Sequence, residues 1–281
     1  MTGRDDVLIS AGDLMRWLAA GERPVLLDVR WRLDHPDGYP DYLNGHLPGA
    51  VYVSLEDELS DHSVTGRGRH PLPSGSALQN AARRWGVTAD RPVIVYDDWN
   101  RAGSARARWV LTASGLTGVR ILDGGLSAWI AGGGALETGP VSPAAGDVVL
   151  PHSDLYAGAR ATYTAQQISA GAATTLIDAR APERFSGAAE PIDAVAGHIP
   201  GAFNLPSGSV LDHAGRFRSA DEIGALLADG IATGPIGVYC GSGVTAAVVI
   251  AALDTAGIDA ALFPGSWSQW SSEPDCPVER G

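Results

Sequence analysis

Lysine is absent from this 281-residue sequence, and all twenty of its basic side chains are arginines. A Schiff-base mechanism needs a lysine amine and is therefore excluded. Cysteine is nearly absent as well, since only Cys240 and Cys276 are present, in neither a CxxC nor a zinc-ligand spacing. Two such cysteines make neither a disulfide framework nor a metal site, and they fit a protein of the reducing cytoplasm.

Basic charge and long apolar runs are also scarce. The formal net charge is −12, which argues against a general nucleic-acid binder because such proteins carry a basic face. A small site inside an acidic protein can still be locally positive and hold an anionic substrate. No apolar run approaches the roughly 20 residues of a membrane helix, and the opening MTGRDDVLIS does not resemble a signal peptide. The remaining composition is typical of a globular protein, long enough for two domains.

Four motifs recur in the same order in the two halves of the chain, which indicates a duplicated domain. The pairs are VLLDVR (25–30) and TLIDAR (175–180), GHLPGAVYVS (45–54) and GHIPGAFNLP (197–206), VIVYDD (93–98) and IGVYCG (236–241), and ILDGGLSAW (121–129) and LFPGSWSQW (262–270). A stretch rich in Gly, Pro and Ala follows the first half. We therefore expect a first domain over residues 1–130, a linker over 131–152 and a second domain over 153–281.

Short strand patterns alternate with helix patterns in both halves. The strand-like segments are 24–29, 92–96, 175–179 and 236–240, and the helix-like segments are 76–86, 104–115, 219–230 and 244–257. Ser219, with Glu222 three residues later, predicts a capping box at the start of one helix. The alternation predicts the α/β class, with a mostly parallel sheet in each domain and helices on both of its faces.

One cysteine falls where a strand pattern ends and a helix pattern begins, in IGVYCGSGVTAA (236–247). In open α/β sheets, ligands bind beyond the carboxyl ends of the strands. Gly241 and Gly243 allow a tight turn with positive φ, whose N–H groups form an anion-binding nest at the start of the next helix. Such donors stabilise a thiolate, so the pattern favours a catalytic Cys240 over a buried packing residue. The equivalent position in the first half is Asp97, which indicates one active copy and one that has lost the chemistry.

A cysteine-dependent phosphatase is the first competing interpretation. Its loop needs an arginine six residues after the cysteine, where it holds the phosphate bidentately. Here that position is Ala246. The loop therefore suits a smaller transferred group, such as a single sulfur atom.

Together these motifs resemble the tandem-domain rhodanese-fold sulfurtransferases. The similarity covers roughly residues 7–275 and rests on CGSGVTA (240–246), on GHLPGA and GHIPGA, on the paired DVR and DAR, and on LDGGLSAW. The resemblance implies that the cysteine of the C-terminal domain becomes a persulfide and passes its outer sulfur to an acceptor. It also implies an inactive N-terminal domain that contributes residues to the cleft between the domains.

Within this family, the neutral CGSGVT loop resembles that of the 3-mercaptopyruvate sulfurtransferases, whereas thiosulfate-using members tend to have basic residues after the cysteine. The resemblance implies a proton relay from Ser242 to a histidine and an aspartate of the first domain. The stretch 54–73 offers His70 and Asp61 for these places. A hydroxyl, an imidazole and a carboxylate can together deliver a proton to a leaving pyruvate enolate. Without the resemblance, His70 reads as an exposed loop residue and Asp61 as a cap or turn residue.

The family holds the mercaptopyruvate carboxylate with two arginines, and the sequence matches only one of them. Arg184, in APERFSG, fits the first position, whereas Ile192 stands at the second. One guanidinium can still bind a carboxylate bidentately, so the missing partner implies weaker binding or a different donor. The alternative for Arg184 is a surface ion pair with a neighbouring glutamate. Those neighbours are Glu183 and Glu190, and the candidate substitutes for the second arginine are Arg160, Arg216 and Arg218.

Several other residues are predicted to be structural. His46 and His198 occur in both GH[LI]PGA turns, and a catalytic residue need not persist in an inactive copy. Asp28 and Asp178 end strands in both halves and are expected to fix loops. Cys276 is expected to be inert, and the eight tryptophans are assigned to the core and the domain interface.

We therefore predict a cytoplasmic sulfurtransferase that moves sulfur from 3-mercaptopyruvate, through a Cys240 persulfide, to cyanide, a small thiol or a thioredoxin-like acceptor. Arg184 is expected to orient the small anionic donor. Loop N–H groups are expected to stabilise the thiolate and the persulfide, and they belong to Gly241, Gly243, Val244 and Thr245. Thiosulfate as the donor is the alternative within this class, and a non-catalytic sulfur-carrying regulatory module is the alternative outside it. We expect no metal, organic cofactor, nucleic acid or membrane partner.

Overall fold

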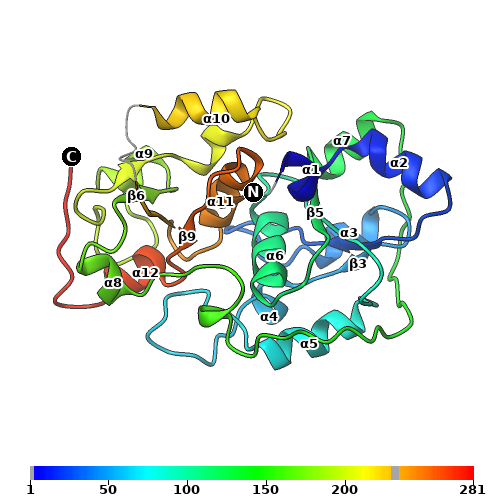
Figure 1. Ribbon diagram of the computed structural model, residues 1–281, viewed down its shortest axis with the longest axis horizontal. Coiled ribbons are helices and arrows are strands. Elements are labelled where there is room, and N and C mark those ends of the chain that lie inside the picture. The colour runs from blue at the N-terminus through cyan, green and yellow to red at the C-terminus, as the bar shows by residue number, and fades with distance from the viewer. Residues whose placement is uncertain (1–2, 229–233) are drawn as a thin grey trace.

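The computed structural model describes residues 3–228 and 234–281. The two halves of the chain form two α/β domains that lie side by side, the first on the right and the second on the left of Figure 1. Each domain has one sheet, and all the strand pairs within both sheets are parallel. The predicted fold class and the duplication are therefore confirmed.

The N-terminal sheet has five strands in the order β1-β5-β4-β2-β3. They are β1 (Leu8–Ile9), β2 (Val25–Asp28), β3 (Val51–Tyr52), β4 (Val93–Tyr96) and β5 (Val119–Leu122). The helices are α1 (Arg4–Val7), α2 (Ala11–Ala19), α3 (Tyr39–Asn44), α4 (Leu55–Glu58), α5 (Gly75–Arg84), α6 (Ala102–Ala113) and α7 (Gly125–Ala131). The central strands β2 and β4 are buried along their whole length because separate apolar clusters cover the two faces of the sheet.

The C-terminal sheet has four strands in the order β7-β6-β8-β9. They are β6 (Thr175–Asp178), β7 (Phe203–Asn204), β8 (Ile236–Tyr239) and β9 (Ala261–Leu262). The helices are α8 (Ala165–Ser169), α9 (Pro182–Phe185), α10 (Ala220–Leu227), α11 (Ala246–Thr255) and α12 (Ser266–Trp270), with single 3-10 turns η1 (Leu155–Ala157) and η2 (Ser207–Val210). A bridge between Thr162 and Leu262 takes the place that β1 has in the other domain.

The predicted strands and helices are present with small shifts at their ends. Strands β2, β4, β6 and β8 and helices α5, α6, α10 and α11 coincide with the eight predicted segments. The predicted capping box is present, with the Ser219 hydroxyl and the Glu222 carboxylate each accepting from the other residue's backbone N–H. The last two residues predicted for this helix, 229–230, lie outside the described residues.

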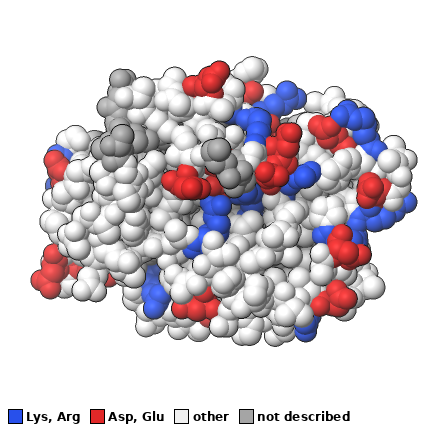
Figure 2. Space-filling view, viewed as in Figure 1, with Lys and Arg blue, Asp and Glu red and all other residues white. Residues whose placement is uncertain are grey.

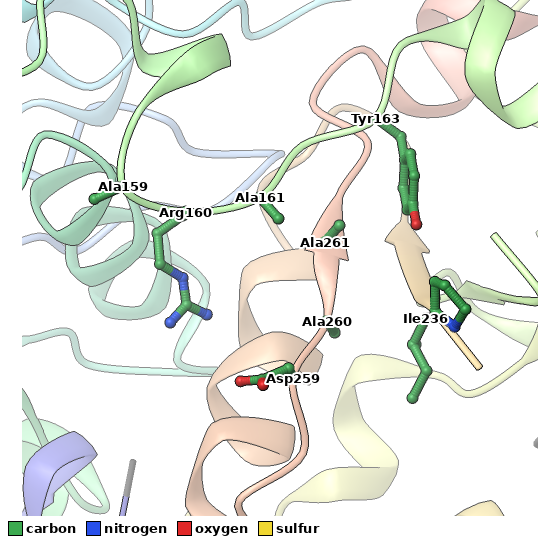
Figure 3. Close-up of a pocket in the computed structure, with 9 residues that line it drawn as sticks. Ala159, Arg160, Ala161, Tyr163, Ile236, Asp259, Ala260 and Ala261 are labelled. Carbon is green, nitrogen blue, oxygen red and sulfur yellow. The ribbon is translucent and has the colours of Figure 1, made fainter. Parts of the chain in front are cut away.

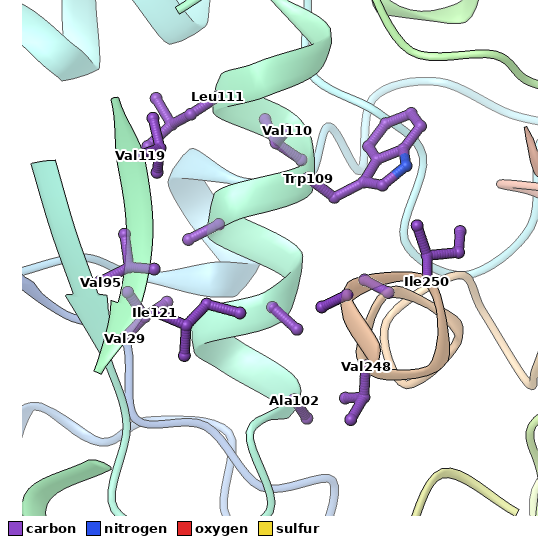
Figure 4. Packing of buried hydrophobic residues seen from close by; sticks show 14 of the residues in the cluster. Val29, Val95, Ala102, Trp109, Val110, Leu111, Val119, Ile121, Val248 and Ile250 are labelled. Atoms are coloured by element: carbon purple, nitrogen blue, oxygen red, sulfur yellow. The ribbon is translucent and has the colours of Figure 1, made fainter. Parts of the chain in front are cut away.

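The two domains meet along α6 and α11, which pack against each other at the centre of the molecule (Figures 1 and 4). All ten residues of α11 are buried, and α6 is buried over nearly its whole length because it lies between its own sheet and α11. Figure 4 shows Trp109 of α6 beside Ile250 of α11. The sequence of α11 is apolar apart from its last two residues, as expected of a buried helix. Helix α6 instead buries two arginines, Arg106 and Arg108, whose guanidinium groups are hydrogen-bonded.

Polar contacts cross the same interface. Asp254 of α11 accepts a hydrogen bond from Arg108 of α6 at 2.7 Å and from Arg160 at 2.9 Å. The Arg4 guanidinium donates to the carbonyls of Phe217 and Arg218 at 2.8 Å each. The domains are thus joined by charge as well as by apolar packing.

The segment predicted to be a linker follows the surface of the N-terminal domain closely. Glu137 exchanges two backbone hydrogen bonds with His46, and Val148 is buried against the domain. In the second domain, Glu279 exchanges the same pair of bonds with His198. The segment is therefore held against the first domain from Glu137 to Val148.

The surface view agrees with the acidic composition. On the face in Figure 2, acidic and basic side chains lie next to one another over the N-terminal half and the junction, rather than in one basic patch. Within residues 3–228 and 234–281, no helix is long and apolar enough to cross a membrane.

Candidate active site

Cys240 directly follows β8 and begins the loop that leads into α11. Its side chain is buried, and the Gly243 N–H donates to its sulfur at 3.2 Å. Gly243 takes the predicted positive φ, 78°, whereas Gly241 does not. Among the described residues, Gly243 is the one whose N–H forms a hydrogen bond with the sulfur, and those expected from Gly241, Val244 and Thr245 form none.

Cys240 lines a pocket of about 230 Å³ that both domains form. The N-terminal domain contributes the apolar side chains of Trp31, Leu33 and Trp99, and the C-terminal domain contributes the loop that starts at Cys240. Trp99 is 52% exposed, so it stands at the rim. Three arginines also line the pocket, namely Arg69, Arg180 and Arg184. The lining of the pocket therefore combines apolar side chains with three guanidinium groups.

A line of hydrogen bonds runs from the Cys240 loop into the N-terminal domain. The Ser242 hydroxyl lies 2.7 Å from Nδ1 of His70, and Nε2 of His70 lies 3.2 Å from a carboxylate oxygen of Glu56. Trp31 Nε1 donates to the same oxygen at 2.6 Å. An ionised carboxylate only accepts hydrogen bonds, so the network assigns the ring proton to Nε2 and leaves Nδ1 to accept from Ser242.

The acid in this line is Glu56, where the sequence analysis expected Asp61. One Asp61 carboxylate oxygen accepts from the N–H and the hydroxyl of Ser63 at 3.1 and 2.5 Å. Asp61 therefore turns away from His70, while Glu56, in the first turn of α4, reaches it. Both carboxylates belong to the acidic stretch SLEDELSD (54–61), and the start of a short helix after Ser54 was the signal that favoured Glu56.

The charges along this line are set by burial and by the hydrogen bonds. Burial alone would raise the pKa of Glu56, but hydrogen bonds from His70 and Trp31 lower it to about 2. Burial lowers the pKa of His70 below its usual value; Glu56 opposes this shift, and Arg106 adds to it. At neutral pH the pair is therefore a carboxylate beside a neutral imidazole.

Arg106 of α6 is a fully buried cation behind the loop. Its guanidinium donates to the carbonyls of Leu59 and His70 at 3.0 Å each and of Gly243 at 3.3 Å. No carboxylate of a described residue lies within ion-pair distance of it. Burial lowers the pKa of Arg106 to about 10, and negative charge on Cys240 is among the influences that oppose this shift. A thiolate at Cys240 and this cation therefore stabilise each other.

Two of the pocket arginines share one carboxylate. The Arg184 guanidinium donates to Glu190 at 2.7 and 3.1 Å and to Asp193 at 3.0 Å. Arg69, from the other domain, donates to the second oxygen of Asp193 at 2.8 Å. The ion pair of Arg184 with Glu190 is thus present, but Arg184 lines the pocket as well, and it forms no ion pair with Glu183. Arg69 was not selected from the sequence, where its place directly before His70 was the only signal.

The other arginines considered as substitutes lie elsewhere. Arg160, Arg216 and Arg218 do not line the pocket of Cys240. Arg160 instead pairs with Asp254 at the domain interface. Ile192 is 37% exposed and does not line the pocket either, so its position supplies no donor there.

The repeated aspartates hold loops in both domains, as the sequence analysis expected. Asp178 accepts from the Arg180 guanidinium at 2.7 Å, and Arg180 in turn donates to the Gly197 carbonyl at 2.7 Å. In the first domain, Asp28, Arg30 and the Gly45 carbonyl make the same arrangement. Each Asp–Arg pair ties the end of one strand to the turn that leads into the next strand.

The repeated histidines are also structural. Nδ1 of His46 lies 3.0 Å from the Tyr42 carbonyl, and Nδ1 of His198 lies 2.8 Å from the Phe185 carbonyl. Each imidazole stacks on the aromatic ring of the same partner.

Burial and a nearby glutamate raise the pKa of Cys276 to about 11, which keeps it in the unreactive thiol form.

In the N-terminal domain, the loop that matches the Cys240 loop already holds a carboxylate. Asp97 follows β4 and accepts from the N–H groups of Trp99, Arg101 and Ser104 at 3.1, 3.3 and 3.0 Å. The Arg101 guanidinium adds an ion pair at 2.9 Å. This copy shows a loop of the same kind binding an anion, with an acid where the other copy has a thiol.

A second hollow lies at the other end of the C-terminal strands (Figure 3). Ile236, at its edge, begins β8, whereas Cys240 follows the end of that strand. Arg160, Tyr163 and Asp259 surround it, together with small alanine side chains. The described residues that line it include no cysteine, serine or histidine.

Comparisons with known families and proteins identify the family of this chain. Residues 10–132 and 161–273 match the rhodanese-like domain family. The chain is 64% identical to a Mycobacterium tuberculosis protein named "Putative thiosulfate sulfurtransferase SseB", covering 100% of this chain and 99% of the relative. It is 38% identical to the 3-mercaptopyruvate sulfurtransferase of Escherichia coli, covering 85% of each chain.

The solved structures point the same way. The crystal structure of SseA from Escherichia coli, described as a 3-mercaptopyruvate sulfotransferase, matches with a TM-score of 0.80 at 33% identity, covering 93% of this chain and 98% of that one. Both the sequence match and the structural match include the two halves of the chain. The protein therefore belongs to the rhodanese-like family and is a sulfurtransferase of the 3-mercaptopyruvate/thiosulfate type.

Proposed function

We propose that the protein uses 3-mercaptopyruvate as its sulfur donor and carries the sulfur as a persulfide on Cys240. The observation that supports this donor is the line from Ser242 through His70 to Glu56, which joins the loop of Cys240 to a buried imidazole and a carboxylate. Such a line moves protons, and only one of the two candidate donors needs a proton moved.

Proton balance separates the donors. The Cys240 thiolate attacks the sulfur of 3-mercaptopyruvate, the carbon–sulfur bond breaks, and its electron pair leaves on the pyruvate enolate. The S–H proton of the donor passes through Ser242 and His70 to the enolate carbon, which gives pyruvate and Cys–S–S⁻. With thiosulfate, the sulfur–sulfur bond breaks, sulfite leaves with the electron pair, and no proton moves.

The remaining groups stabilise the charges of this cycle. The Gly243 N–H on the sulfur and the buried Arg106 cation support the thiolate and the persulfide anion. Glu56 fixes the tautomer of His70 that accepts from Ser242. In the second half-reaction, an acceptor such as cyanide or a small thiol takes the outer sulfur and returns the thiolate. Cys240 and Cys276 are both free thiols, as a reducing cytoplasm would keep them.

Steady-state kinetics with each donor, and cyanide as the acceptor, tests the proposal. We expect kcat/KM to favour 3-mercaptopyruvate by more than tenfold, a transition-state difference above about 1.4 kcal/mol. Cys240→Ser should abolish turnover of both donors. Ser242→Ala should lower the rate with 3-mercaptopyruvate and leave the rate with thiosulfate near that of the unmodified protein.

Three outcomes would contradict the proposal. A preference for thiosulfate, the donor named for the 64% identical relative, would make that ion the substrate and remove the need for a relay. Equal losses with both donors in Ser242→Ala would make the serine a structural residue. If sulfur passed rapidly to one partner protein and slowly to every small acceptor, the protein would be a dedicated sulfur carrier.

A further inference from the structure

We propose that Arg69, from the N-terminal domain, and Arg184, from the C-terminal domain, together bind the anionic end of the sulfur donor. This proposal rests on the sulfurtransferase function proposed above and names the group that recognises the donor's charge. It assigns Arg69 to the place of the second arginine, which Ile192 does not supply.

The two guanidinium groups converge over one point in the pocket. A side-chain carbon built on Gly241, the residue after the nucleophile, would lie 3.3 Å from Nη1 of Arg184 and 3.4 Å from Nη2 of Arg69. Neither of these two nitrogens donates to any described residue. Two donors therefore face the same space beside Cys240, and an anion placed there is within reach of both.

Asp193 explains why the two guanidinium groups stay in this position. One of its carboxylate oxygens accepts from Nη1 of Arg69 at 2.8 Å, and the other accepts from Nη2 of Arg184 at 3.0 Å. The Asp193 side chain is only 7% exposed, so this bridge is shielded from water. Each arginine thus donates to Asp193 with one terminal nitrogen and directs the other terminal nitrogen into the pocket.

A simple surface ion pair does not account for Arg69. Its side chain is 29% exposed, and its Nε atom is buried without a hydrogen-bond partner among the described residues. A guanidinium held this way has given up hydration, and an anion in the pocket would restore hydrogen bonds to it. A carboxylate is the natural ligand of two converging guanidinium groups because both of its oxygens accept.

The position of Arg69 also couples recognition to catalysis. Arg69 precedes His70 in the chain, and its N–H donates to the Ser268 hydroxyl of the C-terminal domain at 3.0 Å. The same short segment therefore presents the relay imidazole and the second guanidinium. Arg69 reaches the pocket, and His70 reaches Ser242, only when the two domains are docked.

The test compares a charged donor with a neutral one. Mercaptoacetone has the leaving group chemistry of 3-mercaptopyruvate, with acetone as its product, but it has no carboxylate. Arg69→Ala should lower kcat/KM for 3-mercaptopyruvate about ten- to hundredfold, mainly through KM, and leave kcat/KM for mercaptoacetone nearly unchanged. Arg69→Lys keeps the charge but lacks the planar pair of donors. Its kcat/KM for 3-mercaptopyruvate should lie between those of Arg69→Ala and the unmodified protein.

Arg67→Ala is the matched control because Arg67 lies in the same loop and its substitution removes the same charge. Its guanidinium sits 4.2 Å from the Tyr156 ring centre and does not line the pocket. We expect both donors to react with this variant as with the unmodified protein. An equal loss with both donors in Arg69→Ala, no loss with either, or the same loss in Arg67→Ala would overturn the proposal. Absence of turnover with any sulfur donor in the unmodified protein would instead refute the proposed function.

Discussion

Glu56 and Asp61 lie in one acidic stretch, yet only Glu56 reaches His70. The cause is local, since the Ser54 hydroxyl accepts from the Asp57 N–H at 3.1 Å and starts a single helical turn. Glu56 leaves the first turn of this helix toward the imidazole. Asp61 comes after the helix has ended and bonds within its own turn. The helix cap at Ser54 thus determines which of the two carboxylates contacts His70.

Replacing Glu56 with glutamine should slow the proton-dependent reaction selectively. In Glu56→Gln, kcat/KM for 3-mercaptopyruvate should fall about ten- to hundredfold, and thiosulfate turnover should change little. In the proposed mechanism the neutral imidazole is the active form, so activity should fall as pH drops through the pKa of His70. Because Glu56 raises that pKa, its loss should move the acid limb of the pH–rate profile to lower pH.

Asp61→Asn provides the comparison for this change. It alters a carboxylate in the same stretch that contacts Ser63 and not His70. Its pH–rate profile should superimpose on that of the unmodified protein. A shift of the acid limb in Asp61→Asn, with none in Glu56→Gln, would restore Asp61 as the relay acid.

At the scale of elements, the link between β8 and α11 positions the sulfur of Cys240. Gly243 has a φ of 78°, and a side chain there would come within 2.6 Å of the Pro264 carbonyl oxygen. Its N–H is the donor that contacts the Cys240 sulfur. Gly243 therefore supplies three things at once: the left-handed turn, the close contact with Pro264 and the N–H that contacts the sulfur.

Gly243→Ala should reduce turnover of both donors at least tenfold because the loop must move and the N–H leaves the sulfur. The left-handed backbone alone would destabilise the fold by roughly 1–2 kcal/mol. Gly257→Ala separates the two effects, since Gly257 ends the same helix with a φ of 71° and open space around it. Thermal unfolding should detect a similar backbone effect in both variants, and only Gly243→Ala should lose activity. Full activity in Gly243→Ala would contradict the role of this N–H.

Elements with a strong pattern could be predicted, and those fixed by tertiary contacts could not. The four central strands and the long helices carry apolar runs or caps that the sequence displays. Strands such as β3, β7 and β9 are two residues long, too short to produce a period. In the site, the glycine-rich loop marked Cys240, and the family resemblance pointed to Ser242 and His70. Arg69 was missed because only the docking of the domains brings it beside Cys240.

At the scale of the whole molecule, the site exists because the two domains are held together. Asp254 is buried between Arg108 of the first domain and Arg160 of the segment that leads into the second. Burial lowers the pKa of Arg108, and Asp254 opposes that shift. Removal of this carboxylate would leave a buried guanidinium without its counter-charge.

Asp254→Ala should therefore destabilise the protein by about 3–5 kcal/mol, measured as a lower midpoint of urea unfolding. Asp13→Ala breaks an exposed ion pair with Arg16 and should leave the midpoint nearly unchanged. Identical midpoints for the two variants would show that the buried bridge contributes no more than a surface pair.

The two backbone hydrogen bonds between Glu279 and His198 make residues 278–281 an integral part of the second domain. Glu279 also accepts from the Gly201 N–H at 3.2 Å, and so closes the turn whose Gly197 carbonyl holds Arg180 in the pocket. In the first domain, Glu137 performs this task from the middle of the polypeptide, anchored on both sides. Removal of residues 278–281 would therefore release the turn that positions Arg180 and leave the equivalent turn of the first domain intact.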